Sequence, residues 1–188
     1  IEVKKGIEIS LYEGINDFLG DLYNIRGISE AMFGNYKVAL DFYNLSIDAF
    51  RKSDREFEMV KPTNNIGNLY NEIYGRPKTA LDYYYRSYEI SEKYGLTSMQ
   101  ATFLNNIGEV YFTLQDYESA KEYLLKATEL GKVTGDKRLS FLSTVNLGMV
   151  YLKTEKLKEA IEIYLLIREK NKNEPILDKE INIHYTNF

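Results

Sequence analysis

The stretch NNIGEVYFTLQDYESAKEYLLKA, residues 105–127, predicts two amphipathic helices joined by a short polar turn. Its apolar side chains recur at intervals of three and four, which places them on one face of each helix. Two asparagines and a glycine precede the first apolar run, although all three are poor helix formers and glycine costs about 1 kcal/mol relative to alanine. The same letters, NNIG, occur at 64–67, so a requirement other than helix propensity selects them.

The glycine of this stretch recurs along the whole chain. Successive copies are 40, 41 and 40 residues apart, at Gly27, Gly67, Gly108 and Gly148. An alanine follows each glycine by twelve or thirteen residues, and four residues later comes a large side chain: Tyr43, Tyr84, Leu124 or Tyr164. The short turns GN, GRPK, QD and TEK predict antiparallel helices. Small residues at matching sites let the two helices approach closely, and this packing role outweighs the poor helix propensity of glycine.

This pattern resembles the tetratricopeptide repeat, whose signature distributes Leu-Gly, Tyr, Ala and aromatic positions over a helical hairpin. The period of about 40 residues is similar to that of kinesin light chains, spindle-orientation adaptors and bacterial peptide-sensing regulators. The resemblance covers nearly the whole chain and implies an all-α, right-handed superhelical solenoid. Repeat one departs from the signature at Arg26 and Glu30, and repeat four has Ile167 where a small residue belongs.

The repeats divide one predicted domain, residues 1–188, into about four full hairpins with a half-repeat at each end. The predicted segments are 1–10 (end of a preceding repeat), 11–53, 54–95, 96–134 and 135–173 (four repeats) and 174–188 (start of a fifth repeat). The extra residue of the 41-residue interval is expected near YGRPKTAL, residues 74–81. Solenoids need polar caps, and neither end carries one, so we expect a piece of a longer array.

Composition excludes several functions. The net charge of −4 argues against a general nucleic-acid binder, and no apolar run approaches the ~20 residues that span a bilayer. The absence of cysteine excludes disulfides and thiolate zinc sites and fits a cytoplasmic location. The single histidine, His184, has no partner suited to catalysis, and no phosphate-binding loop or HExxH motif occurs. We therefore predict no enzymatic activity, no cofactor, and no direct contact with nucleic acid or membrane.

Polar residues surround the repeated glycines. On the first helix of each hairpin they point away from the partner helix, toward the concave wall that stacked hairpins form. They comprise Asn64 and Asn105 three residues before glycine, Asn65, Asn106 and Asn146 two before, Asn68 and Glu109 one after, and Lys61 six before. The family resemblance implies that Asn65, Asn106 and Asn146 bind the main chain of an extended peptide, for which an amide offers both a donor and an acceptor.

An alternative is that these asparagines bond between neighbouring helices and fix the stacking, and the two roles are compatible. Lys61 has no basic counterpart at Asp21, Thr102 or Leu142, so a basic carboxylate clamp is not expected. Arg26 and Glu30, four residues apart, are predicted to form a local ion pair.

The sequence thus predicts a non-catalytic module that binds a protein or peptide segment in its concave groove, as the sensory or docking part of a larger bacterial signalling protein. The alternative is a self-associating scaffold, a homo-oligomer formed through the exposed terminal half-repeats or through DYYYRSY, residues 82–88. Three consecutive tyrosines cannot share one helix face, so at least one of them is expected to be exposed.

Overall fold

The computed structural model describes residues 2–13 and 18–173, and all regular structure within these ranges is helical. The expected start of a fifth repeat, 174–188, lies outside the described residues, as does His184. The helices are α1 (Glu2–Glu13), α2 (Leu19–Met32), α3 (Tyr36–Lys52), α4 (Val60–Asn68), α5 (Pro77–Lys93), α6 (Thr97–Thr113), α7 (Tyr117–Val133), α8 (Lys137–Lys153) and α9 (Leu157–Asn173). A 3₁₀ turn, η1 (Glu56–Met59), precedes α4, and a π turn, η2 (Leu69–Ile73), follows it.

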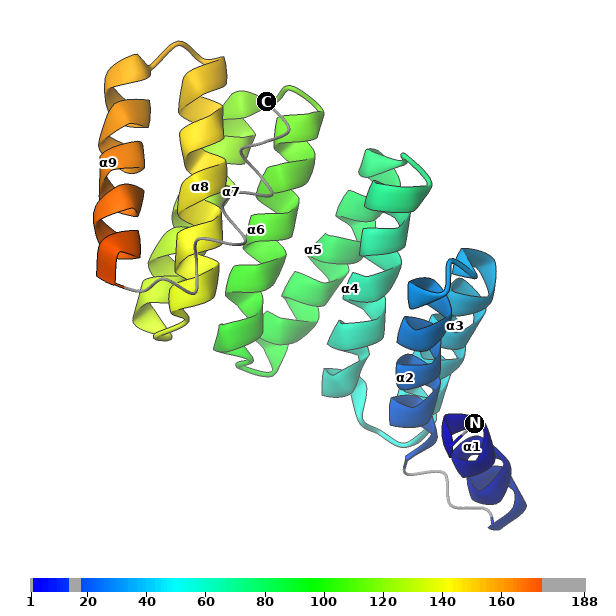
Figure 1. The fold of residues 1–188 in the computed structure, drawn as a ribbon. Helices are drawn as coiled ribbons and strands as arrows, with labels where there is room; N and C mark the ends of the chain where they lie inside the picture. Colours follow the sequence, from blue (N-terminus) through cyan, green and yellow to red (C-terminus); the bar gives the residue numbers. More distant parts are fainter. Residues whose placement is uncertain (1, 14–17, 174–188) are drawn as a thin grey trace.

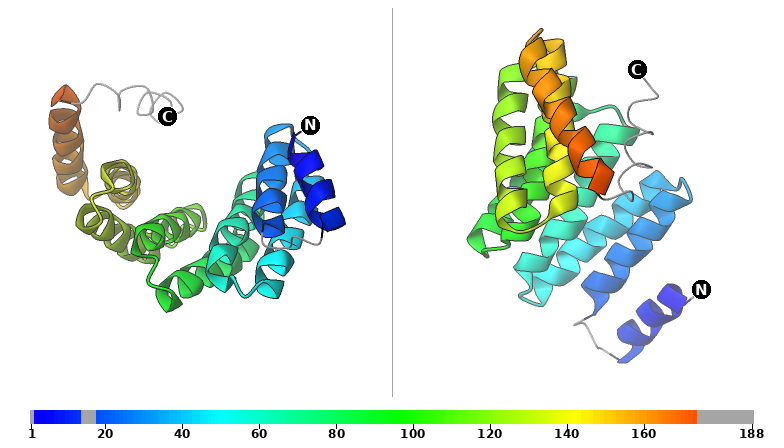
Figure 2. Two further views of the ribbon diagram at one scale, coloured as in Figure 1. Left: turned by 90° about the horizontal axis from the view of Figure 1, so that it is seen from below. Right: turned by 60° about the vertical axis from the view of Figure 1, so that its left-hand side comes forward.

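The helices pair as four antiparallel hairpins: α2–α3, α4–α5, α6–α7 and α8–α9 (Figure 1). α1 packs against α2. The hairpins stack along an arc (Figure 2), and the first helices are neighbours, since α2 contacts α4 and α6 contacts α8. The predicted all-α solenoid is confirmed.

Each hairpin turns sharply at one residue in the left-handed backbone region. Glycine fills this position in the first two hairpins, with φ of 81° at Gly34 and 58° at Gly75. Gln115 and Glu155 fill it in the third and fourth hairpins, with φ of 63° and 57°. A single left-handed residue is a common way to end a helix, so these turns bring the next helix back antiparallel.

The extra residue of the second repeat lies slightly earlier than the sequence suggests. The first helix of this repeat continues beyond Asn68 as the π turn η2, in which the Tyr74 N–H donates to the Leu69 carbonyl at 3.0 Å. A π turn closes over five residues and therefore accommodates one residue more than an α turn. The insertion is absorbed at 69–73 rather than at 74–81, and the α4–α5 hairpin keeps its packing.

The repeated glycines have the predicted packing role in the first three hairpins. A Cβ added to Gly27 or Gly67 would come within 2.6 Å of the ring of Tyr43 or Tyr84, and one on Gly108 within 2.7 Å of Leu124 Cγ. Real side chains do not approach so closely, so only glycine fits beneath these buried groups. At Gly148 the nearest contact is Cγ2 of Ile163 at 3.1 Å, so the fourth hairpin packs differently.

None of the tyrosines in DYYYRSY is fully exposed, contrary to the expectation. Tyr84 is buried, and the half-buried Tyr83 stacks on Tyr70 with ring centroids 5.4 Å apart. The half-buried Tyr85 has its hydroxyl 2.9 Å from the hydroxyls of both Tyr111 and Tyr123. Burial and these hydrogen bonds raise the pKa of Tyr85. The covering rings come from η2 of the same hairpin and from the next hairpin, which pattern analysis within one helix does not reveal.

Candidate functional site

A ladder of asparagine amides crosses the first helices of the four hairpins. In each step the asparagine two residues before a glycine donates its amide N–H to the side chain three residues before the preceding glycine. The three bonds of this asparagine ladder are Asn65 Nδ2 to Asn24 Oδ1 (3.2 Å), Asn106 Nδ2 to Asn64 Oδ1 (2.9 Å) and Asn146 Nδ2 to Asn105 Oδ1 (3.1 Å). The asparagines therefore bond between neighbouring helices, the arrangement that the sequence left as the alternative.

The ladder leaves amide groups available in its first half. Asn65 and Asn106 are half-buried, and each uses one N–H; their Oδ1 atoms have no hydrogen-bond partner among the described residues. Asn64 accepts one bond through Oδ1, and its own amide N–H groups have no partner among residues 2–13 and 18–173. Because an asparagine amide has two donors and a carbonyl acceptor, these side chains can bind a further polar group.

In the second half of the ladder, the asparagine side chains are buried and hydrogen-bonded within the protein. Asn146 is only 5% exposed, and its Nδ2 also donates to Glu109 Oε1 at 2.6 Å. Asn105, 2% exposed, donates to the same oxygen at 3.0 Å. The carboxylate of Glu109 thus joins α6 to α8, and these three predicted site residues mainly hold the two helices together.

Two other predicted site residues are also engaged within the protein. Asn68 Oδ1 accepts a hydrogen bond from the Tyr84 hydroxyl at 2.8 Å, so this side chain faces the partner helix α5 rather than the groove. Burial raises the pKa of Tyr84, and the negative charges of Glu72 and Glu109 add to this effect. The ammonium group of Lys61 pairs with Glu58 at 2.8 Å, which partly neutralises its charge.

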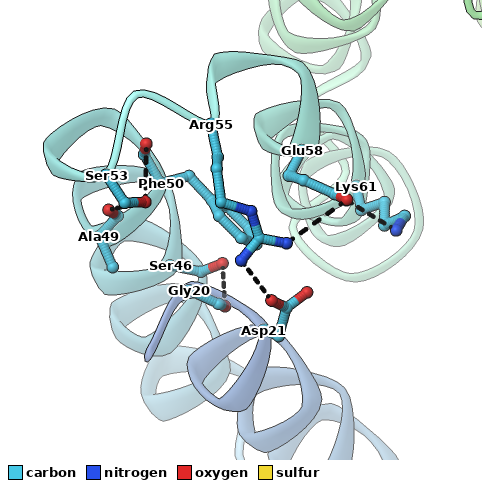
Figure 3. Close-up of polar contacts among 9 residues, drawn as sticks. All are labelled: Gly20, Asp21, Ser46, Ala49, Phe50, Ser53, Arg55, Glu58 and Lys61. Carbon is cyan, nitrogen blue, oxygen red and sulfur yellow. Dashed lines mark hydrogen bonds and ion pairs between the residues drawn. The ribbon is translucent and has the colours of Figure 1, made fainter. Parts of the chain in front are cut away.

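An ion-pair chain fixes the first hairpin against the second (Figure 3). Arg55 contacts Asp21 of α2 at 2.8 Å and Glu58 of η1 at 3.5 Å, and its guanidinium lies 5.1 Å from the centre of the Phe50 ring. Nearby, Ser46 donates to the carbonyl of Gly20 at 2.7 Å. Within repeat one, the predicted pair of Arg26 with Glu30 is present, with Glu30 buried. Of these contacts, the two ion pairs of Arg55 join α2 to the turn η1 that precedes α4.

A pocket of about 260 Å³ opens between α2, α4 and α6 beside the free amides. It is lined by Asn24, Ile28, Lys61, Asn64, Asn65, Met99, Thr102 and Phe103. Small-molecule pockets usually measure ~300–1,000 Å³, so this one is closer in size to one or two side chains. Sequence reasoning missed Met99 and Phe103. One feature of the sequence could have indicated an apolar pocket here. Ile28 is apolar, whereas the equivalent residues of the next two repeats, Asn68 and Glu109, are polar.

Within the described residues, no cluster of three or more His, Cys, Asp or Glu side chains is placed to hold a metal ion. No helix in the same part of the chain is long and apolar enough to cross a membrane.

Known proteins share part of this sequence pattern and the fold. Residues 99–169 match the family model described as tetratricopeptide repeat. This segment covers the third hairpin and most of the fourth, so the match to tetratricopeptide repeats concerns that part of the chain. No curated protein matches its sequence. The chain is nevertheless similar in fold to several solved structures, all of low sequence identity.

Three solved structures illustrate the likeness. The apo form of RapI has a TM-score of 0.76 at 18% identity, with 99% of this chain and 74% of RapI covered. BtubC (BKLC) from P. vanneervenii has a TM-score of 0.73 at 18% identity, with 82% and 63% covered. A putative kinesin light chain from Podosopora anserina, with nearly identical TPR-like repeats, has a TM-score of 0.70 at 13% identity, with 92% and 85% covered. The match thus spans less than two thirds of BtubC, and at these identities the likeness concerns the fold.

The asparagine ladder predicts a measurable coupling between two hairpins. Replacing Asn106 with alanine should lower the free energy of unfolding by about 1 kcal/mol, the typical net value of one hydrogen bond. In a double-mutant cycle with Asn64→Ala, urea denaturation should give a coupling energy of about 0.5–1 kcal/mol. Asn65→Ala with Asn106→Ala, a pair that shares no bond in the ladder, serves as the control and should be additive. Equal coupling in both cycles would contradict the ladder.

Proposed function

We propose that this domain is a non-catalytic interaction module that binds an extended segment of a protein or peptide along the groove formed by α2, α4 and α6. The observation that carries the proposal is the pocket of about 260 Å³, because it combines apolar side chains with amide groups that the ladder leaves free. An extended segment presents alternating main-chain donors and acceptors together with protruding side chains. The pocket and its asparagine rim suit both parts of such a ligand.

The polar and the apolar residues of the pocket have different roles in this proposal. Asn64 and Asn65 bind the main chain of the ligand, and Ile28, Met99 and Phe103 receive one of its apolar side chains. Each hydrogen bond contributes about 1 kcal/mol net, and a buried apolar side chain contributes about 1.5–3 kcal/mol. Micromolar affinity requires about 8 kcal/mol, so a single pocket is insufficient.

The ligand must therefore continue along the groove toward the half-buried Asn106. The contacts between α6 and α8 support ligand binding indirectly, because they hold these two helices in place. They involve Asn105, Glu109 and Asn146. In this proposal Lys61 borders the ligand, and its pairing with Glu58 limits its preference for acidic segments.

The family resemblance of the sequence supports placing this module in a larger bacterial signalling or regulatory protein, as its sensory or docking part in the cytoplasm. The solenoid architecture supports the same role, since stacked repeats create extended concave binding surfaces.

The test uses Ile28→Asp, which places a charge in the pocket, and Val38→Asp as the matched control. Both are β-branched apolar residues of similar exposure, 40% and 43%, but Val38 lies on α3 and does not line the pocket. A random linear peptide library displayed on phage is selected on the wild-type domain, and the enriched peptides are titrated by fluorescence anisotropy. We expect Ile28→Asp to weaken binding by about tenfold or more, a loss of about 1.4 kcal/mol or more, and Val38→Asp to leave it unchanged.

Circular dichroism first establishes that both variants fold. Equal affinity of the enriched peptides for wild type and Ile28→Asp would show that they bind elsewhere and would overturn the groove. Equal losses in both variants would point to a general charge effect, which contradicts the pocket as well.

A further inference from the structure

The turns of the first two hairpins expose large apolar side chains to solvent. In the first hairpin these are Met32 and Phe33, which are 82% and 79% exposed, the two highest values among the large apolar residues of the described chain. In the second hairpin they are Ile73 and Tyr74, which are 41% and 38% exposed. Single exposed apolar residues are common on protein surfaces, whereas a group of them marks an interaction site.

The two exposed pairs are equivalent in the repeat and belong to neighbouring turns. Ile73 follows Met32 by 41 residues, and Tyr74 follows Phe33 by the same interval. The turns within the hairpins lie along one edge of the solenoid, at the top in Figure 1. On this edge α3 of the first hairpin contacts η2 of the second, the segment that ends at Ile73. Neither pair lines the groove pocket.

A lysine accompanies each pair. Lys37 and Lys78, again 41 residues apart, are the second residues of α3 and α5. Both are exposed, and neither has an ion-pair partner among residues 2–13 and 18–173. The helix macrodipole disfavours a positive charge in the first turn of a helix, so these lysines do not serve the stability of α3 and α5. The turn-edge patch consists of Met32, Phe33, Lys37, Ile73, Tyr74 and Lys78.

The third hairpin lacks this combination. Its equivalent residues are Thr113, Leu114 and Glu118. Leu114 is partly buried against a hydrophobic cluster, and Glu118 has the opposite charge to Lys37 and Lys78. The patch is therefore a property of the first two hairpins and not a general consequence of the repeat.

We propose that the turn-edge patch binds an acidic amphipathic helix of a partner protein. Charge complementarity supports this partner. Segments 32–38 and 73–78 carry three basic residues and no acidic one, whereas the equivalent segment 113–119 carries two acidic residues and no basic one. A partner that covers the apolar pairs also removes water from the lysines beside them, so it must bring carboxylates to pair with them.

The spacing of the two turns suits a helix. α2 packs against α4, and the axes of packed helices are about 8–10 Å apart, so equivalent side chains of the two hairpins are separated by a similar distance. An α-helix places residues seven apart on one face about 10.5 Å from each other. A helix that lies across both turns therefore offers one apolar residue to each exposed pair and a carboxylate to each lysine.

Two other occupants fit the patch less well. A second copy of the chain that used the same patch would place its own lysines against Lys37 and Lys78, because a twofold interface joins identical surfaces. Anionic membranes are typically bound by clusters of about four to eight basic residues. The two turn segments carry three, and the chain has a net charge of −4.

The test uses a phage library of amphipathic helices with leucine fixed on one face and Glu, Lys or Gln varied on the other, selected on the wild-type domain. We expect the enriched peptides to be rich in glutamate. In fluorescence anisotropy titrations, Phe33→Asp/Tyr74→Asp should weaken their binding by about thirtyfold or more, since buried aromatic residues dominate interfaces. Lys37→Glu/Lys78→Glu should weaken it on the order of tenfold, since each exposed ion pair contributes modestly.

Two control variants make matched changes outside the patch. Val133→Asp alters a side chain that is 72% exposed at the end of α7, and Lys158→Glu alters the residue equivalent to Lys37 in the fourth hairpin. Both should leave binding unchanged, and circular dichroism establishes that all variants fold. A peptide whose glutamates are exchanged for lysines should bind Lys37→Glu/Lys78→Glu and not the wild type, an exchange that a structural role of these lysines would not produce.

Several outcomes would overturn the proposal. Enrichment of neutral or basic helices, or of none, would remove the acidic partner. Unchanged affinity in Phe33→Asp/Tyr74→Asp would place the binding site elsewhere. Sedimentation of the wild type with phosphatidylserine vesicles, lost in the same double variant, would assign the patch to an anionic membrane. A dimeric mass in light scattering that this variant reduces to a monomer would assign it to a second copy.

Discussion

Replacing Tyr84 with alanine should lower the free energy of unfolding by about 3–5 kcal/mol, the usual cost of truncating a buried aromatic side chain. The ring is buried above Gly67 and shares a cluster with Ile107 and Val110 of the next hairpin. Its hydroxyl also bonds to Asn68. The substitution therefore removes contacts within the second hairpin and between the second and third hairpins at once. Urea denaturation followed by circular dichroism measures the change.

Tyr84→Phe is the matched control, because it keeps the ring and removes only the hydroxyl. It should cost about 1 kcal/mol, the net value of the bond to Asn68. Since a solenoid is stabilised by nearest-neighbour interfaces, Tyr84→Ala should also broaden the unfolding transition by uncoupling the hairpins on either side. A loss below about 1 kcal/mol for Tyr84→Ala would contradict the role of this ring, since even partial truncation of a buried side chain costs more.

Equivalent glycines in consecutive repeats should respond differently to the same substitution. Gly108→Val is expected to lower the free energy of unfolding by about 2–3 kcal/mol through overpacking. The new Cβ would lie 2.7 Å from Cγ of Leu124, a branch point in a fully buried side chain that has no room to move. Gly148→Val should be close to neutral, because its Cβ meets only Ile163 at 3.1 Å and a pocket lies beside it.

This pair of variants is internally controlled, since both replace a glycine in the interior of a first helix with the same residue. Valine has a helix propensity only a few tenths of a kcal/mol better than glycine, so propensity does not mask the packing effect. Thermal or urea unfolding of the two variants beside wild type gives the comparison. Equal destabilisation at both positions would mean that the fourth hairpin packs like the third, contrary to the structure.

The hairpins could be predicted from sequence because the determining interactions are local. Glycine, alanine and a large side chain recur at a fixed spacing, and each set acts within about 20 residues, as Gly67 and Tyr84 do. Amphipathic spacing and short turns then leave antiparallel pairing as the only compact arrangement. The same geometry placed Asn65, Asn106 and Asn146 at equivalent positions on the first helices, where they are found, whereas Asn68 turned out to face α5.

Interactions between hairpins were not determined by these patterns. Whether Asn106 faces a ligand or Asn64 depends on how closely α6 approaches α4, and that distance is set by the stacking of complete hairpins. The same holds for Tyr85, whose covering rings come from α6 and α7. The groove pocket likewise arises only when Ile28, Met99 and Phe103 from three helices are brought together.

The amino-acid sequence by itself determined the helices, their antiparallel pairing and the solenoid, because helix periodicity and the small-residue seam are encoded within each repeat. Tertiary structure alone decided which asparagines keep a free hydrogen-bonding group, as Asn65 does, and which are buried and hydrogen-bonded within the protein, as Asn146 is. It also decided that Tyr164 turns outward while Tyr84 is buried. The physical reason is that these contacts join side chains of different helices, so they depend on how complete helices pack and not on the pattern within one repeat.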